Sequence, residues 1–170
     1  MILREKKFIL RPARLSDAPE IYRYQQEPET KKNFMSVPKS VAEVKKDILK
    51  YKQNTKKKLG EYFVIDIDGK VAGEISFHFW TPPKKYKAIL SVWVAKKHRG
   101  KGIATEATKL ITKYAFKKYP LVRLEANVRT FNKPSARVLE KVGFKLEGVL
   151  RKNKQKGNKY YDDFVYAMIK

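Results

Sequence analysis

Residues 99–104 read Arg-Gly-Lys-Gly-Ile-Ala, and this stretch is the most informative one in the chain. It follows an apolar run, residues 88–94, that is typical of a β-strand, and it opens an amphipathic run with helical spacing, residues 103–118. The first N–H groups of a helix have no intrahelical acceptor, and glycines let a phosphate approach the backbone closely. The stretch therefore predicts an anion site for a phosphorylated ligand, to which Arg99 and Lys101 add positive charge.

Two common phosphate-binding motifs do not fit these residues. No Gly-Lys-Ser/Thr follows four residues after a glycine, as a P-loop requires. The third glycine of the dinucleotide-binding fingerprint is missing, and the stretch lies late in the chain. What remains is Arg-x-x-Gly-x-Ala between a strand and a helix, with an ordinary basic strand-to-helix turn as the alternative interpretation.

The composition limits the class of protein. A chain of 170 residues with 42% hydrophobic residues predicts a single domain, residues 1–170, with a sizeable core. No apolar run approaches the ~20 residues that span a bilayer, and the charged N-terminus lacks the apolar core of a signal peptide. We therefore expect a cytoplasmic protein without a membrane partner. Because the chain has no cysteine and only two histidines, we expect no disulfide, no cysteine nucleophile and no metal site.

The charge is strongly positive. Forty basic and 17 acidic residues give a net charge of +23. Such a surface attracts polyanions, including coenzyme A, acidic peptides, RNA and the ribosome, and it repels polycations. The alternative interpretation is a lysine-rich surface of the kind found in thermophiles.

Hydrophobic spacing and capping signals predict a mixed α/β domain with one central sheet. Strands are expected at residues 8–12, 62–66, 71–77, 86–94, 122–128, 144–150 and 163–169. Helices are expected to begin at caps Asp17, Ser40 and Asn132, and at residue 103. A hairpin turn is expected at residues 68–69, a loop at 29–39, and a basic polar turn at 152–159.

Four stretches and the order of elements carry a resemblance to a known family. Residues 99–104 resemble the coenzyme A pyrophosphate loop of the GNAT N-acetyltransferases, whose order of elements matches essentially the whole chain. Residues 102–107 and 132–144 resemble the loop-to-helix stretch and the Asn-x-x-Ser…Leu-Glu-Lys-x-Gly-Phe block of the RimJ/RimL-type ribosomal-protein alanine acetyltransferases, and residues 147–151 also fit. The resemblance implies the GNAT fold, in which about four helices flank one twisted, mixed and mostly antiparallel sheet.

The resemblance also implies a site for acetyl-CoA as cosubstrate. Backbone groups of Val92, Trp93 and Val94 would pair with the pantetheine arm, as a strand edge pairs with an added strand. Asn132 would hydrogen-bond the lower pantetheine, with an N-cap as the alternative role, and Ser135 would lie near the sulfur, with a helix-start residue as its alternative. The pyrophosphate would be held by Arg99, Gly100, Lys101, Gly102, Ile103, Ala104 and Thr105.

The catalytic acid and base depart from the family pattern. Ile89 stands where this branch often has a glutamate, so Glu74 on the neighbouring strand becomes the candidate catalytic base, with a solvated strand residue as the alternative. The pair at residues 162–163 could also supply a carboxylate. Leu139 stands where many members carry a tyrosine acid. The tyrosines that could replace it are Tyr160, Tyr161 and Tyr166.

The missing glutamate favours an α-amine substrate. An α-amino group has a pKa of about 7.7–8.0 against ~10.4 for lysine, so it needs less help to lose its proton. We therefore expect an acetyl-CoA-dependent N-acetyltransferase, monomeric or homodimeric, that acts on the N-terminus of a protein, with ribosomal proteins among the candidates. One alternative is a small-molecule amine or polyamine acetyltransferase, although the charge argues against spermidine. The other is a weakly catalytic GNAT fold that binds RNA or the ribosome.

Overall fold

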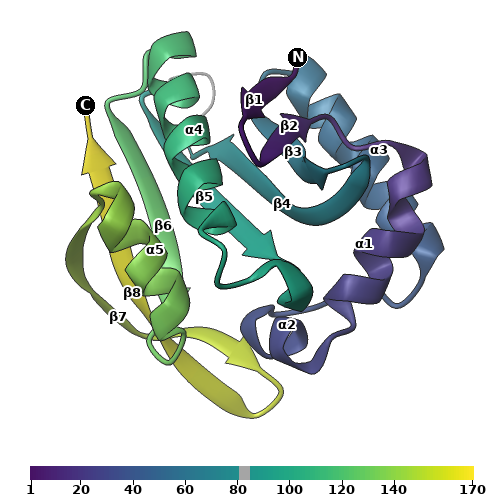
Figure 1. The fold of residues 1–170 in the computed structure, drawn as a ribbon. Helices are drawn as coiled ribbons and strands as arrows, with labels where there is room; N and C mark the ends of the chain where they lie inside the picture. The colour runs from purple at the N-terminus through teal and green to yellow at the C-terminus, as the bar shows by residue number, and fades with distance from the viewer. Residues whose placement is uncertain (81–84) are drawn as a thin grey trace.

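The structure is a computed structural model that describes residues 1–80 and 85–170, and one eight-stranded sheet runs through it (Figure 1). The order across the sheet is β1-β2-β3-β4-β5-β6-β8-β7, and each recorded strand pairing is antiparallel except that of β5 with β6. This confirms the mixed α/β class and the mostly antiparallel sheet. The strands are β1 (Leu3–Glu5), β2 (Phe8–Arg11), β3 (Gly60–Ile67), β4 (Lys70–Phe79), β5 (Lys87–Val94), β6 (Arg123–Arg129), β7 (Lys145–Lys156) and β8 (Lys159–Ile169).

Helices cover both faces of the sheet (Figure 1). They are α1 (Ala18–Gln25), α2 (Pro28–Asn33), α3 (Val41–Lys56), α4 (Ile103–Lys118) and α5 (Lys133–Val142). On one face, α4 and α5 bury Ile111 and Leu139 against strand residues such as Phe77. On the other face, α1 and α3 bury Ile21 and Ile48 in a second cluster. None of the helices in the described ranges is long and apolar enough to cross a membrane.

Several local signals act as the sequence predicts. The Ser40 hydroxyl accepts the Glu43 N–H at 3.2 Å and so caps α3. Asp68 and Gly69 both have positive φ, as the two-residue turn between β3 and β4 requires. Helix α4 spans the predicted residues, and Gly143, with φ +103°, ends α5.

Three local expectations are wrong because tertiary contacts prevail. Residues 29–39 do not form only a loop, since α2 begins at Pro28 and is held by a contact with the distant Arg99. Residues 152–159 are not a turn, since β7 and β8 extend to Lys156 and Lys159. Asp17 stands at the N-cap position of α1 as predicted, but its carboxylate does not cap the helix, because it instead accepts hydrogen bonds from Arg11. With α2 the described helices number five, one more than expected, and β1 was not expected at all.

The parallel pair β5 and β6 separates along its length. Their pairing is recorded only from Lys87 with Arg123 to Ile89 with Glu125, whereas β5 continues to Val94. The last part of β5 therefore has backbone groups on its β6 side that no strand in the described ranges pairs. On its other side β5 stays close to β4. At Gly73 the two strands approach so tightly that a Cβ would lie only 2.2 Å from the Trp93 carbonyl oxygen. The sheet thus opens between β5 and β6 while β4 and β5 remain together.

Candidate functional site

The predicted anion loop has the backbone geometry of an anion site. Gly100 and Gly102 have φ of +75° and +78°, and a Cβ on either would meet nothing within 4 Å. The N–H of Glu106 is the first in α4 to find a backbone acceptor, the Gly102 carbonyl at 3.0 Å. Within the described ranges no acceptor is recorded for the N–H groups of residues 100–105. These orphan donors, at the positive end of a 16-residue helix, fit a pyrophosphate.

The two cations of the loop have different surroundings. Nη1 of Arg99 lies 2.6 Å from Glu29 Oε2, and Nη2 lies 3.0 Å from Thr30 Oγ1. Its Nε donates to the Val94 carbonyl at 2.9 Å. The guanidinium therefore ties α2 to the end of β5. Lys101 is exposed and, among the described residues, has no carboxylate partner, so its ammonium is the loop charge available to a ligand.

The other predicted coenzyme A residues lie at the same end of the sheet. Because β5 and β6 are parallel, the segments that follow them, which lead into α4 and α5, open at their common carboxyl end. Asn132 caps α5 by accepting the Ser135 N–H at 3.3 Å, so it has the N-cap role that was one of its two predicted roles. Ser135 is half-buried in the first turn. Val92, Trp93 and Val94 lie on the β5 side of this opening, beyond the recorded pairing with β6, and the Val94 carbonyl there accepts the Arg99 Nε–H.

A pocket of about 100 Å³ opens on the α1 and α3 side of the same strands, and we call it the Glu74 pocket. Its walls are largely aromatic, and Tyr51 from α3 stacks on Tyr62 from β3 with ring centroids 4.2 Å apart. The residues that line it are Ala13, Gln25, Phe34, Tyr51, Tyr62, Phe63, Glu74, Ile75, Ser76, Ser91 and Trp93.

Glu74 is the only carboxylate in this lining, and neighbours from two elements hold it. Its Oε2 accepts the Trp93 Nε1–H at 2.9 Å and the Gln25 Nε2–H at 3.3 Å. Burial raises the pKa of Glu74 to about 7, although these hydrogen bonds favour the charged form. The alternative of a solvated strand residue is therefore wrong. Trp93 is half-buried, and its indole N–H holds this carboxylate.

Two oxygens in the Glu74 pocket lack a donor. Oε1 of Gln25 is buried, and no hydrogen bond to it is found within the described ranges. Both recorded bonds to Glu74 go to Oε2, which leaves Oε1 without a described protein donor. A buried acceptor without a donor costs free energy, so the Gln25 oxygen suits a ligand that brings an N–H group, and the neighbouring Glu74 Oε1 can accept a second one.

The remaining acid and base candidates are engaged elsewhere. Tyr166 is buried and donates to Glu140 at 2.9 Å. Asp163 is buried and pairs with Arg129. None of Tyr160, Tyr161 and Tyr166 lines the Glu74 pocket. Sequence reasoning missed Gln25, Phe34 and Tyr51, which come from three segments far from Glu74 and carry no local signal of their role.

Comparison with known proteins gives one family. The acetyltransferase (GNAT) domain profile matches residues 7–145. The Bacillus subtilis protein named "Probable N-acetyltransferase YjcK" is 32% identical over 175 residues, covering 99% of this chain and 97% of that one. The structure of Mycobacterium smegmatis RimJ in complex with CoA-disulfide is 26% identical, with a TM-score of 0.85 and coverage of 95% and 81%.

A second solved structure shows how far the fold is shared. The Salmonella typhimurium acetyl transferase that modifies the N-terminal serine of the 50S protein L7/L12 has a TM-score of 0.89, at 20% identity and 100% and 99% coverage. GNAT enzymes use acetyl-CoA, the ligand class that the free N–H groups of the anion loop suit. With the profile covering most of the chain and an end-to-end relative, this protein belongs to the GNAT family and is an N-acetyltransferase.

Proposed function

We propose that the protein transfers the acetyl group of acetyl-CoA to the N-terminal α-amine of a protein, with Glu74 as the general base. The observation that carries this proposal is the pKa of about 7 for Glu74, in a pocket where the buried Gln25 Oε1 has no donor among the described residues. An α-ammonium group has a pKa of about 7.7–8.0, within roughly one unit of this carboxyl. A lysine side chain, at ~10.4, lies more than three units away and would give up its proton far less readily.

Each residue of the site has a separate role in acyl transfer. Oε1 of Glu74 and Oε1 of Gln25 accept the N–H groups of the incoming amine, and Glu74 takes its proton. The neutral nitrogen then forms a C–N bond with the thioester carbon as the C–S bond breaks. Backbone N–H groups of β5 on its open side stabilise the oxyanion. The Ser135 hydroxyl gives a proton to the leaving thiolate and regains one from the acylated nitrogen, which loses its extra proton as the amide forms.

The same opening would hold the cosubstrate. The N–H groups of residues 100–105 would bind the pyrophosphate, and the open edge of β5 at Val92, Trp93 and Val94 would pair with the pantetheine arm. Arg99 would act indirectly, by fixing α2 and the segment that carries Phe34. The likeness to RimJ and to the enzyme that modifies L7/L12 supports a protein acceptor, with ribosomal proteins as the first candidates.

The test is an acetyl-transfer assay over four acceptors: peptides with a free N-terminus, N-blocked peptides with one lysine, spermidine, and free amino acids. We expect the first class to have the highest kcat/KM at pH 7.5, and Ser135→Ala to lower kcat by ~10–100-fold without changing coenzyme A binding. Turnover confined to lysine peptides or to spermidine would contradict the α-amine proposal. Best turnover of free amino acids would assign the pocket to a small-molecule amine.

A further inference from the structure

The long hairpin formed by β7 and β8 carries an unusual concentration of positive charge. Residues 151–159 contain no acidic residue, and none of the cations at 151, 152, 154 and 159 forms an ion pair within the described ranges. We call Arg151, Lys152, Lys154 and Lys159 the hairpin cations, and all four are exposed. Asp162, the nearest acid in sequence, uses an oxygen to accept the Lys152 backbone N–H at 2.7 Å. The surface of the hairpin therefore carries positive charge that the described carboxylates largely leave unneutralised.

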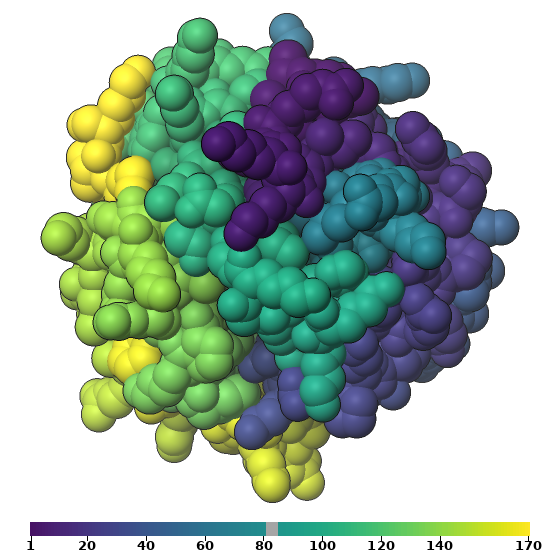
Figure 2. All heavy atoms as spheres, viewed as in Figure 1, coloured from purple at the N-terminus to yellow at the C-terminus, as the bar shows by residue number. Residues whose placement is uncertain are grey.

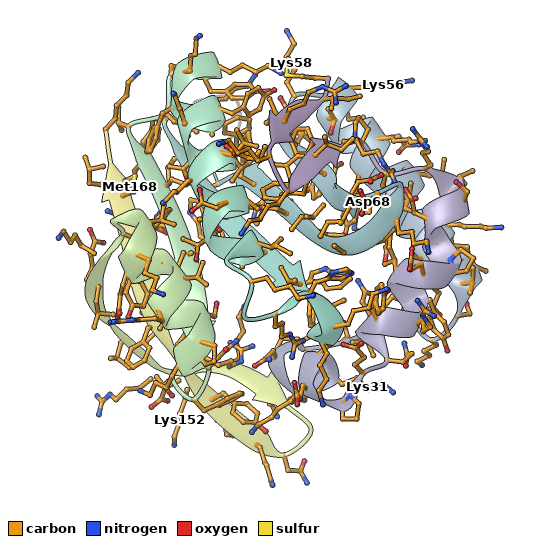
Figure 3. All side chains as sticks on the ribbon, in the orientation of Figure 1. Lys31, Lys56, Lys58, Asp68, Lys152 and Met168 are labelled. Carbon is orange, nitrogen blue, oxygen red and sulfur yellow. The ribbon has the colours of Figure 1, made fainter. Side chains whose placement is uncertain are left out.

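This hairpin borders the Glu74 pocket through one contact. The Lys156 ammonium donates to the backbone carbonyls of Lys31 and Phe34, at 2.7 and 2.8 Å, and Phe34 lines the pocket. Figure 1 shows the hairpin extending towards α2, and Figure 3 labels Lys152 and Lys31 at this end of the molecule. In the space-filling view, hairpin atoms lie beside those of α2 (Figure 2). Lys31 and Lys32 of α2 are exposed and add their charges on the same side.

We propose that the hairpin cations dock an acidic segment of the acceptor protein, just beyond the N-terminus that enters the Glu74 pocket. This inference rests on the proposed function. An extended chain advances about 3.3–3.6 Å per residue, so a protein whose first residue sits at Glu74 leaves the pocket within a few residues. An acceptor chain that leaves the pocket past Phe34 reaches the hairpin with its next residues. Carboxylates at these positions are attracted by several cations at once.

An acidic polypeptide suits this surface better than RNA does. Proteins that bind single-stranded nucleic acid combine positive charge with exposed aromatic faces on which bases stack. Here Phe131 and Tyr161 pack edge to face against each other, with centroids 5.9 Å apart, and the Lys32 ammonium lies 5.0 Å from the Phe131 ring. The exposed Tyr160 lies under Lys152, whose ammonium is 5.9 Å from its ring. Phe131 and Tyr160 are exposed, but a lysine ammonium lies 5.0 and 5.9 Å from their rings and would compete with a base for the ring face, whereas the hairpin cations are directly accessible.

The experiment compares two charge reversals of equal size. The hairpin variant carries Lys152→Glu, Lys154→Glu and Lys159→Glu. The control variant carries Arg4→Glu, Lys6→Glu and Lys7→Glu, exposed positions at the β1 and β2 edge, opposite β7 in the sheet. A third variant replaces the three hairpin lysines with arginine. Two peptides share the same first two residues and continue either with four acidic residues or with four glutamines. Their kcat/KM is measured, and the binding of N-acetylated copies is measured by fluorescence anisotropy.

The hairpin variant should lose about tenfold or more in kcat/KM for the acidic peptide, through KM, and the same factor in its binding. The glutamine peptide, the control variant and the arginine variant should behave like wild type. Equal losses in both reversed variants would overturn the proposal, since net charge alone would then act. Binding of a fluorescent oligouridylate is measured in the same way. If the hairpin variant loses affinity for it but keeps wild-type kcat/KM and binding for both peptides, the proposal is overturned in favour of RNA. If the wild-type protein acetylates neither peptide, but the hairpin variant still binds the acidic peptide more weakly than wild type does, the proposed function is contradicted and the docking proposal is not.

Discussion

At the scale of the residue, Glu74 shows how its surroundings make a base out of an ordinary carboxyl. From the sequence alone Glu74 can be placed on a strand, but its chemical role cannot be assigned. Its pKa of about 7 arises because Trp93 lies opposite on β5 while Gln25 and Tyr51 come from two helices, so that the side chain loses water on several sides. No local pattern records such an assembly, and this is why the sequence could name Glu74 as a candidate but could not choose between a base and a solvated residue.

The first prediction concerns Glu74→Gln. In wild type, kcat/KM for a free N-terminus should rise with pH through an ascending limb near 7, because the carboxylate must be ionised to take the proton. The variant should lack that limb and lose about 100-fold or more in kcat/KM. Glu5→Gln, an exposed change on β1, serves as the control and should leave the profile unchanged. A wild-type limb retained in Glu74→Gln would assign the titration to another group.

The same substitution should stabilise the fold above neutral pH. In the folded protein Glu74 keeps its proton up to about pH 7, while in the unfolded chain it ionises near 4.5. Stability is therefore lost as the pH rises through that window, and an amide that cannot ionise avoids the loss. We expect Glu74→Gln to melt at the wild-type temperature at pH 4 and at a higher temperature at pH 8. A lower melting temperature at pH 8 would show that Glu74 has a structural role.

At the scale of the element, local signals decide where helices and strands begin, and distant contacts decide the rest. The Ser40 cap, the turn at residues 68–69 and the Gly143 stop are each set by neighbours in sequence, and each was predictable. Helix α2 was not predictable, because its short polar sequence is held in place by the contact between Glu29 and Arg99, which are 70 residues apart. The outer half of the hairpin was missed for a related reason, since its alternating polar residues look like a turn until the partner strand is known.

The anion loop allows a matched test at this scale. Gly102→Asp and Gly69→Asp place the same side chain at φ of +78° and +79°, both in open space, so the backbone cost should be similar. Only the first puts a carboxylate at the orphan N–H groups of α4. We expect Gly102→Asp to weaken coenzyme A binding by ~30-fold or more in calorimetry, by like-charge repulsion, and Gly69→Asp to bind normally. Equal affinity in both variants would show that the loop has been misassigned.

At the scale of the whole molecule, one buried network joins the N-terminal strand to the rest. Nη1 of Arg11 lies 2.7 Å from Asp17 and its Nε lies 2.5 Å from Asp66 on β3, with all three residues buried. Burial tends to raise the pKa of Asp17, but the hydrogen bonds from Arg11 and from the Arg14 backbone outweigh it and lower that pKa. The sequence did not reveal this network, since each partner looked like an ordinary strand or cap residue.

Removing the cation should be costly for the fold. Arg11→Met would leave two buried carboxylates without a counter-charge, and we expect the free energy of unfolding at pH 7 to fall by about 3–5 kcal/mol in urea titrations. Arg137→Met, which breaks an exposed pair with Glu140, should change it by less than about 1 kcal/mol. Because Asp17 has a lowered pKa, the contribution is lost as the pH falls below its usual 3.8. The difference between Arg11→Met and wild type should therefore shrink near pH 2.5.

The separation of β5 from β6 has a consequence for amide hydrogen exchange. Along the last residues of β5, successive amides point alternately to β4, where pairing continues to Val94, and to the open side, where it ends at Ile89. In the free enzyme, exchange should therefore alternate from residue to residue, slow then fast, within one strand. Saturation with coenzyme A should slow the fast set and leave the slow set unchanged, so that this strand reports occupancy of the cleft at single-residue resolution.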